Sequence, residues 1–427
     1  MKSLPNKIVL VDFGATRVKS VLVDTLFGAV IDSVEVDSPS RKSDSDRAGY
    51  FEVAAEKYQQ AFEQTALTLL RRNDAVNAIY ICSEMHGFAL LNKNTNTVSP
   101  YISWKDTRVN INSYEHLAPG FFEFTAMKLR PGLPFLNLKL AVAAGQDYKF
   151  LTLVDAVLTL SGCTEIKTDL SLAASTGLVD LNKKEWSREL CPFNNVEFTE
   201  LNLDVAQPIA KLGSVNIYGG IGDLQAAVLG AGLNDNAVFN LGTGSQVICK
   251  DQQIGHELRP YVHGNLRVIT HIPSGRALNI IAEFFNSIAD DSTFFWQHWA
   301  NLSADDVFNA QDCVDLNMFE AAWQYNAASG FIKFREGRSD FKSVLADIAK
   351  SWAMQYISAL NKLDPEYKQT TVTVSGGLAH KSKFLIDVLS RLDANRTYNN
   401  STITLAEETL EGLYNLYLLN ENSSNRS

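Results

Sequence analysis

The sequence predicts an α/β protein made of two related domains, each with a mixed sheet flanked by helices. Segments with strand character alternate along the chain with segments of helical periodicity, which is the pattern of α/β proteins. Two strand–glycine turn–strand segments, at 8–24 and 240–250, also resemble each other and lie in opposite halves of the chain. We therefore place a boundary near Asn234, and we expect domains at 1–234 and 235–427 that face a shared cleft.

The first half begins with two expected strands joined by a tight turn, within residues 8–24. Apolar residues at helical spacing predict an amphipathic helix at 52–72. The apolar run AIYICSE at 78–84 predicts a buried strand, and residues 151–162 predict a helix that Gly162 ends. The mixed, polar stretch that follows indicates short strands.

The second half repeats the strand and glycine-turn pattern. NLGTGSQVICK at 240–250 predicts a hairpin, and TVTVSGGLAHKSKFLIDVL at 371–389 predicts a strand, a Gly-Gly turn and an amphipathic helix. Long helices are expected at 278–290 and 341–363. The polar tail at 420–427 is expected to be disordered.

The composition excludes several classes of partner. Nucleic acids and anionic membranes need a concentrated basic surface, so the formal net charge of −10 argues against both as the main partner. The five cysteines lie far apart without a CxxC pair, which disfavours a disulfide framework or a zinc site and fits a reducing, cytoplasmic location. We identify no signal peptide and no apolar run long enough to span a bilayer, so we expect no membrane association.

Three glycine turns are candidates for binding phosphate or nucleotide. A glycine turn between strands leaves backbone N–H groups uncrowded, and such groups bind phosphate oxygens. Each turn alone is better explained as an ordinary hairpin, because glycine is the usual turn residue and short glycine motifs are weak signals. Their recurrence makes a nucleotide site a competitive hypothesis, and the candidate residues are Gly14, Thr16, Gly242, Thr243, Gly376 and Gly377.

Asp12 ends the first expected strand, beside the first glycine turn. A carboxylate there would repel a phosphate unless a cation intervened, and Mg²⁺ binds one or two carboxylates together with phosphate oxygens. Asp12 is therefore a candidate Mg²⁺ partner, although a turn aspartate that bonds its own backbone is a common alternative. The tripeptide DFG also occurs in protein kinases, but here no glycine-rich loop precedes it and no HRD segment follows.

The segment YGGIGDLQAAVLGAG at 218–232 places Asp223 after three glycines, at the start of a helix of small residues. As an N-cap alone, Asp223 would stabilise the helix by about 1 kcal/mol. As a catalytic group, it would accept a proton from an attacking hydroxyl. We expect the helix N-terminus to keep Asp223 ionised, and the loose transition state of phosphoryl transfer tolerates a weak base.

Two further segments, CSEMHGFALLN at 82–92 and YISWKDTR at 101–108, contain the residue types that bind sugars. Carboxylates and amides bind hydroxyl groups, and an aromatic face stacks on sugar C–H groups. His86, Trp104 and Asp106 are of these types. The structural alternative is a satisfied core histidine and a solvated turn, since lone histidines and loop charges usually have such roles.

Taken in order, these segments resemble those of the FGGY carbohydrate kinases, within the sugar kinase–Hsp70–actin superfamily. DFGATRVKSVLVD is similar to the first phosphate motif of that family, and NLGTGSQV to the second. SEMHGFALL resembles the Q-M-H-G sugar segment, SWKDTR the W-x-D-x-R loop, and VSGGLAHKSKFL the adenosine motif. YGGIGDLQAAVLGAG is similar to the segment with the catalytic base, and KTDLSLAASTGLVDLNKKEW to the stretch S-x-A-S-x-T-G-L-x-D-x-x-x-x-x-W. The resemblance covers most of the chain.

The resemblance implies two ribonuclease H-like (actin-like ATPase) domains, with sugar and phosphate bound by the first and nucleotide by the second. It implies ATP-dependent phosphorylation of a terminal hydroxyl of a ketose, with Asp223 as the general base and Asp12 positioning Mg²⁺. The same resemblance adds Arg108 to the sugar-binding set of His86, Trp104 and Asp106. Partners are then a small sugar and ATP, and a homodimer is compatible with the resemblance.

Within the family, ELRPYVHGNLRVITHIPSGRALNIIAEFF at 257–285 is similar to sedoheptulokinase-like members, so sedoheptulose is the expected sugar. The alternatives are a xylulokinase, a ribulokinase or a polyol kinase, or a nucleotide-binding sugar sensor that does not phosphorylate. The chain departs from the family pattern at Glu84, where Gln is usual, and at Leu378, where a third glycine is common. The second half is also shorter than in typical members.

Overall fold

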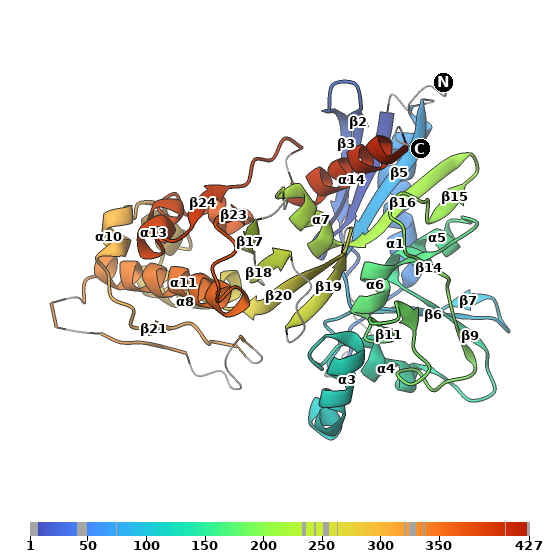
Figure 1. Cartoon of the computed structure of the whole chain (residues 1–427), viewed down its shortest axis with the longest axis horizontal. Helices are drawn as coiled ribbons and strands as arrows, with labels where there is room; N and C mark the ends of the chain where they lie inside the picture. The colour runs from blue at the N-terminus through green and yellow to red at the C-terminus, as the bar shows by residue number, and fades with distance from the viewer. Residues whose placement is uncertain are drawn as a thin grey trace. The chain divides into compact units, whose positions relative to one another are not determined.

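The computed structural model divides into two compact units (Figure 1). Unit 1 comprises Met1–Gly230, Arg259–His263 and Ile403–Ser427, and unit 2 comprises Ala231–Leu258 and Gly264–Thr402. The expected boundary at Asn234 lies outside the described residues, and the C-terminal segment, expected in the second domain, belongs to unit 1. The structure describes residues 7–40, 49–73, 75–232, 236–242, 245–250, 256–262, 264–319, 322–323, 330–334, 336–337, 339–405 and 407–424.

Unit 1 is built on a mixed six-stranded sheet with the order β15-β16-β5-β1-β2-β3. Strand β1 is apolar and buried along almost its whole length, as befits a central strand. It pairs parallel with β5, which pairs parallel with β16, so the carboxyl ends of these strands meet at one edge of the sheet. The strands are β1 Lys7–Phe13, β2 Arg17–Asp24, β3 Ala29–Asp37, β5 Val76–Ser83, β15 Ala210–Leu212 and β16 Val215–Gly222.

Unit 2 repeats this topology in a six-stranded sheet with the order β19-β20-β18-β17-β23-β24, of which the end of β19, from Arg259 on, is assigned to unit 1. In both sheets an antiparallel hairpin is extended on one side by an antiparallel strand and on the other by two parallel strands. The repeat confirms the prediction of two related domains with mixed sheets. The strands are β17 Ala237–Asn240, β18 Ser245–Lys250, β19 Glu257–Tyr261, β20 Gly264–Ile272, β23 Thr371–Ser375 and β24 Thr397–Asn400.

Helix α14 (Glu408–Ser424) packs in unit 1 against β1, β5 and helix α7 (Asp223–Gly230), as Figure 1 shows. The expectation of a disordered tail is therefore wrong for residues 420–424, and residues 425–427 lie outside the described part. The helix continues because its last turns have partners: Asn420 is buried, and its Nδ2 donates to the carbonyl oxygen of Val205 at 3.0 Å. Buried leucines of α14 and apolar residues of β1 and β5 share one hydrophobic core.

The expected helix at 52–72 is shorter and interrupted: α1 (Ala55–Phe62) continues through a π-helical turn (Glu63–Leu67) into α2 (Thr68–Arg71). Helix α5 (Leu153–Leu160) ends near Gly162 as expected, because Gly162 has a φ of 74°. A smaller sheet of unit 1 has the order β13-β9-β6-β7. The strands of this sheet and the remaining elements of unit 1 are β4 Glu52–Val53, β6 Ala89–Asn92, β7 Thr97–Val98, β8 Tyr101–Ile102, a 3₁₀ helix Ile111–Leu117, α3 Ala118–Thr125, α4 Pro134–Ala141, β9 Tyr148–Leu151, β10 Thr168–Asp169, α6 Leu170–Ser175, β11 Val179–Asp180, β12 Glu185–Trp186, β13 Val196–Phe198 and β14 Leu201–Asn202.

The long helices expected in the second half are confirmed as α8 (Gly275–Ala289) and α11 (Phe341–Leu363). Both contribute to the core of unit 2, in which Trp299 and Trp352 are fully buried. Within the described residues, none of the helices is both long and apolar enough to span a membrane. The other elements of unit 2 are α9 Phe294–Ala300, α10 Ala304–Phe308, β21 Val314–Asp315, β22 Phe331–Ile332, α12 Gly377–Lys381 and α13 Leu385–Leu392.

Candidate active site

Three carboxylates gather at the carboxyl edge of the unit 1 sheet. Asp12 is the penultimate residue of β1, Glu84 follows the last residue of β5, and Asp223 follows the last residue of β16. The register places Ser83 opposite both Phe13 and Gly222, so the three strands end at the same level. Neighbouring strands lie about 4.8 Å apart, and the carboxylates therefore influence one another electrostatically.

A β-bulge in β16 delivers Asp223 to this edge. Gly219 and Gly220 have φ angles of 82° and 65°, and the pairing with β5 shifts between Gly219 and Ile221. A Cβ at Gly219 would lie 2.7 Å from the carbonyl oxygen of Ile81, so the bulge requires glycine. After the bulge, the Gly222 N–H donates to Ser171 Oγ at 3.1 Å, which fixes the turn into α7.

Asp223 lies at the first position of α7 and is partly exposed. Its Oδ1 accepts the N–H of Leu224 at 2.8 Å. Burial, and after it the charge of Asp12, raises the pKa of Asp223 to about 7. We expected the helix N-terminus to keep Asp223 ionised, but desolvation outweighs the backbone donors and shifts the pKa of Asp223 upward. The raised pKa makes Asp223 a stronger base than expected, close to the best value for proton transfer near neutral pH.

Asp12 is buried and held by groups from separate parts of the chain. Thr409 Oγ1, from α14, donates to Asp12 Oδ2 at 2.7 Å, and Cys82 Sγ lies 3.5 Å from Asp12 Oδ1. Burial raises the pKa of Asp12 to about 6. Lys19 stands opposite Asp12 in the β1–β2 register, and its Nζ pairs with Glu407 at 2.7 Å.

The surroundings of Asp12 fit Mg²⁺ bound together with a phosphate. Among the described residues, no group of three or more His, Cys, Asp or Glu side chains could hold a metal ion by itself. Mg²⁺ that accompanies a nucleotide uses only one or two carboxylates, and it takes its other ligands from phosphate oxygens and water. A cation there would also stabilise the ionised form of a carboxylate whose pKa burial has raised.

The first glycine turn connects β1 to β2, next to Asp12. A Cβ at Gly14 would lie 3.1 Å from the carbonyl oxygen of Arg17, so a larger residue would crowd the turn. Thr16 is exposed, and its carbonyl oxygen accepts the N–H of Ser38 at 2.9 Å. The hydrogen bond from Ser38 therefore fixes the turn, while Thr16 itself stays exposed to solvent.

His86 adopts a left-handed backbone conformation with a φ of 65°, which is rare for a residue other than glycine. Its Nδ1 lies 2.7 Å from the carbonyl oxygen of Ser175, and its backbone N–H donates to Ser175 Oγ at 3.2 Å. Because a carbonyl only accepts, Nδ1 carries the hydrogen, and Nε2 of the neutral ring is an acceptor. Such a fixed orientation suits a ligand that donates a hydroxyl hydrogen.

The structure gives Asp106 and Arg108 a different environment from the one expected. Asp106 is 0% exposed, and its carboxylate accepts the Phe51 N–H at 2.7 Å and the Arg108 guanidinium at 2.6 and 2.8 Å. Arg108 also pairs with Glu52 at 2.6 Å and lies over the ring of Tyr50. These contacts fix the 101–108 loop, and the direct contact with sugar expected of Asp106 and Arg108 stays a prediction.

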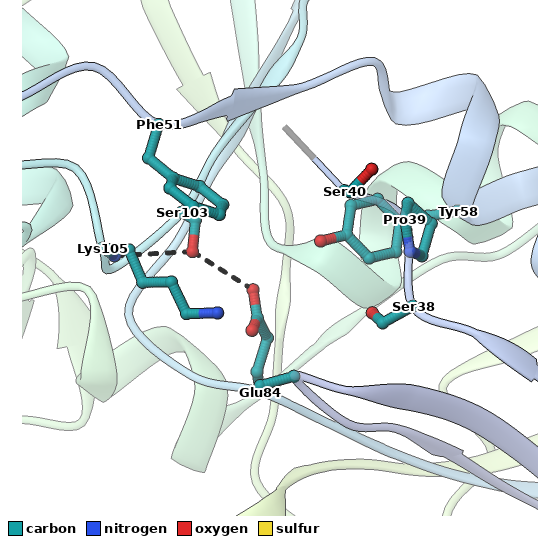
Figure 2. Close-up of a pocket in the computed structure, with 9 residues that line it drawn as sticks. Ser38, Pro39, Ser40, Phe51, Tyr58, Glu84, Ser103 and Lys105 are labelled. Carbon is teal, nitrogen blue, oxygen red and sulfur yellow. Dashed lines mark hydrogen bonds between the residues drawn. The ribbon is translucent and has the colours of Figure 1, made fainter. Parts of the chain in front are cut away.

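Trp104 and Lys105 lie in the same loop and are accessible, Trp104 being 44% exposed. The Lys105 ammonium lies 5.5 Å from the centre of the Trp104 ring and 5.2 Å from that of Phe51. Lys105 and Glu84 line a cavity of about 270 Å³, as Figure 2 shows. The loop anchored by Asp106 thus presents an aromatic face and a cation next to a cavity.

The glycine turns of the second half lie side by side within unit 2. Strands β17 and β23 are parallel neighbours with Asn240 opposite Ser375, so Gly242 and Gly376 both follow the carboxyl ends of their strands. Gly376 has a φ of 95°, and a Cβ there would lie 2.5 Å from the carbonyl oxygen of Leu241. Gly377 begins α12, and a Cβ on it would meet nothing within 4 Å. Thr243 lies outside the described residues.

Sequence reasoning missed Lys19 and Thr409, which surround Asp12. The expected hairpin with its turn at 14–16 already pairs position 12 with position 19, so Lys19 could have been found from the register. Thr409 carries no local signal, because it reaches Asp12 across 397 positions of sequence.

Comparisons with known proteins show the family of the chain. The FGGY family of carbohydrate kinases, N-terminal domain, matches residues 7–231, and the chain belongs to this family. Xylulose kinase of Lactococcus lactis subsp. lactis (strain IL1403) is 23% identical over 269 residues, which cover 57% of this chain and 53% of that protein. The match thus spans about half the length of that curated relative.

Solved structures of sugar kinases share the fold of the whole chain. The ligand-bound xylulose kinase of Lactobacillus acidophilus has a TM-score of 0.80 at 18% identity, covering 98% of this chain and 90% of that chain. A gluconate kinase structure from Lactobacillus acidophilus gives the same TM-score, identity and coverage. At such identities the likeness establishes the fold, which this chain shares with these sugar kinases.

Proposed function

We propose that this chain is an ATP-dependent carbohydrate kinase that phosphorylates a terminal hydroxyl of a ketose. The observation that carries the proposal is the position of Asp223: partly exposed at the head of α7, on the same sheet edge as Asp12, with a pKa of about 7. A carboxylate of that basicity can accept the proton of an attacking alcohol at neutral pH.

In the proposed reaction Asp223 accepts the proton of the sugar hydroxyl as the hydroxyl oxygen attacks the γ-phosphorus of ATP, and ADP leaves as the bond from the β–γ bridging oxygen to that phosphorus breaks. Asp12 would hold Mg²⁺, which when bound neutralises phosphate charge. The Thr409 hydroxyl donates to the Asp12 carboxylate, and Lys19 lies opposite Asp12 in the strand pairing. The orientation of the Asp12 carboxylate is therefore set before ligands bind. In a loose phosphoryl-transfer transition state such positioning contributes more than base strength.

We assign nucleotide contacts to the glycine turns. Gly14 and Thr16 would offer backbone donors to phosphate oxygens from unit 1, and Gly242 and Thr243 would do so from unit 2. Gly376 and Gly377 would let adenosine approach the backbone, which is supported by their place beside the Gly242 turn.

His86 and Trp104 are the proposed sugar-binding residues, with Asp106 and Arg108 holding the loop of Trp104. The curated relative is named a xylulose kinase, which supports a five-carbon ketose as the first candidate. Sedoheptulose remains a second candidate, on the similarity of residues 257–285 to sedoheptulokinase-like members. The fold alone does not choose between them, because neighbours with different named substrates share it equally.

The test is a panel of ketoses and polyols of three to seven carbons with ATP and Mg²⁺, followed by coupled detection of ADP. We expect Asp223→Asn to lower turnover on the best sugar by at least ~10²-fold, the low end for loss of a positioned base. Asp147→Asn, at an exposed aspartate of unit 1, serves as the matched control and should retain activity. ADP formation that does not depend on sugar, or unchanged turnover of the Asp223 variant, would contradict the proposal.

A further inference from the structure

The cavity beside the 101–108 loop contains a charged pair that is not in contact. Glu84, Ser103, Lys105 and Phe51 lie on one side of it, and Tyr58 and the serines at 38 and 40 on the other (Figure 2). Among the ion pairs of the described residues, none joins Glu84 to Lys105, although the Lys105 charge lowers the pKa of Glu84. The ammonium and the carboxylate therefore border the same space without neutralising each other directly.

The Glu84 carboxylate is buried in the wall of the cavity. Its side chain is only 6% exposed, and burial raises its pKa, while hydrogen bonds from Tyr101, Trp104 and Ser103 act in the opposite direction. A buried carboxylate is unfavourable unless hydrogen-bond donors compensate for its lost hydration. The cavity is the direction from which a ligand could supply such donors.

The cavity lies next to the proposed catalytic base. Glu84 and Asp223 follow the ends of neighbouring parallel strands, with Ser83 opposite Gly222. A Cβ on Gly222 would lie 2.6 Å from Met85 Sδ, so the chain after Glu84 touches the chain before Asp223. The charge of Glu84 also raises the pKa of Asp223. A molecule in the cavity would thus contact Glu84, whose neighbour along the sheet edge is Asp223.

We propose that this cavity binds the part of the substrate remote from the reacting hydroxyl, that Lys105 contacts oxygen atoms of that part, and that the Glu84 carboxylate selects neutral polyhydroxylated sugars over sugar acids. The assignment rests on the kinase activity proposed above. A hydroxyl group can donate to Glu84 and accept from Lys105 at the same time, whereas a carboxylate can only accept. A sugar acid would therefore have to face the Glu84 carboxylate as a like charge or force it to take up a proton, and both are unfavourable.

The size and the walls of the cavity agree with a single small sugar. Its volume of about 270 Å³ is just below the usual range of ligand pockets, and it is suited to a monosaccharide. Phe51 and Tyr58 offer apolar ring surface to sugar C–H groups, and the serines offer hydroxyls that both donate and accept.

The test compares a neutral ketose and a sugar acid, D-xylulose and D-gluconate, by kcat/KM with ATP and Mg²⁺. In Glu84→Gln the ratio of gluconate to xylulose should rise by ~10-fold or more, because the like charge is gone and the amide donates to a carboxylate. In Lys105→Met the same ratio should fall, because gluconate loses its cation. Glu200→Gln, at an exposed glutamate of unit 1, is the matched control and should leave the ratio unchanged.

Titration calorimetry with the same two compounds and no ATP separates this proposal from the kinase activity. Loss of xylulose binding in the Lys105 variant together with gluconate binding in the Glu84 variant supports the cavity assignment, even if no sugar supports ADP formation. A wild-type protein that prefers gluconate, or an unchanged gluconate-to-xylulose ratio in both variants, overturns it. Lys105 is exposed, so we expect the Lys105→Met variant to fold. The test therefore stays decisive even if Glu84→Gln fails to fold.

Discussion

At the residue scale, burial sets the chemistry of the carboxylates on the sheet edge. Asp12 and Asp223 both have pKa values raised by desolvation, to about 6 and about 7. The ionised forms of Asp12 and Asp223 are unfavourable in the folded protein, because they are less well solvated there than in the unfolded chain. These two carboxylates therefore lower the stability of the folded protein at neutral pH, but they are able to bind a cation or a proton.

Asp223→Asn should make the protein more stable above neutral pH. The pKa of Asp223 is raised in the folded state, so between about pH 4 and 7 the folded protein binds more protons than the unfolded chain, and stability falls as pH rises. The amide of Asn avoids this penalty and can still accept the Leu224 N–H. We expect a gain of about 1–2 kcal/mol in unfolding free energy at pH 8, allowing for partial exposure, and almost none at pH 4.

Urea unfolding of both proteins at the two pH values measures this gain. A variant that is less stable than the wild type at pH 8, or equally stabilised at both pH values, would show that the Asp223 charge is not strained in the fold.

Thr409 is the second residue for which we expect a specific effect. Its hydroxyl donates to Asp12 at 2.7 Å, so Thr409→Val leaves the carboxylate with a different orientation and one donor fewer. We expect kcat/KM to fall by ~10-fold and half-saturation by Mg²⁺ to need more metal, whereas Thr409→Ser should restore both. Equal Mg²⁺ dependence in the wild type and the Val variant would assign Thr409 to packing alone.

At the scale of elements, α14 and α7 lie backbone to backbone. A Cβ on Gly412 would lie 1.8 Å from the carbonyl oxygen of Ala226, and one on Gly230 would lie 1.9 Å from that of Glu408. Asn415 Nδ2 further donates to the carbonyl oxygen of Leu229 at 3.1 Å. The helix that begins with Asp223 is thereby held by the helix that supplies Thr409, so one contact positions both carboxylates of the site.

Gly412→Ala should separate these helices. The added methyl group has no room, and we expect a loss of about 1–3 kcal/mol in unfolding free energy together with lower kinase activity. Gly120→Ala is the matched control, because Gly120 also lies in a helix and a Cβ there meets nothing within 4 Å. That control should be neutral or slightly stabilising. Comparable losses in the two variants would mean that the contact between α14 and α7 carries no special weight.

At the scale of the whole molecule, local patterns predicted the fold better than they predicted its long-range contacts. The two glycine hairpins predicted the repeated sheets, because strand and turn signals are local in the sequence. Asp12 and Asp223 were found because each directly follows or ends a recognisable strand. The return of α14 to unit 1 was missed, because its polar end gives no sign of the partners that bury Asn420. The enclosure of Asp106 was missed for the same reason, since Phe51 and Arg108 are recognisable as its partners only in the folded loop.

The bond between Thr409 and Asp12 also has a consequence for biosynthesis, because it joins residues 397 positions apart. The first strand leaves the ribosome long before the segment that covers it, and until then the apolar surface of β1, β5 and α7 is open to water and to other chains. During that interval the nascent polypeptide exposes apolar surface that favours aggregation, and α14 removes this surface from water when the chain is complete.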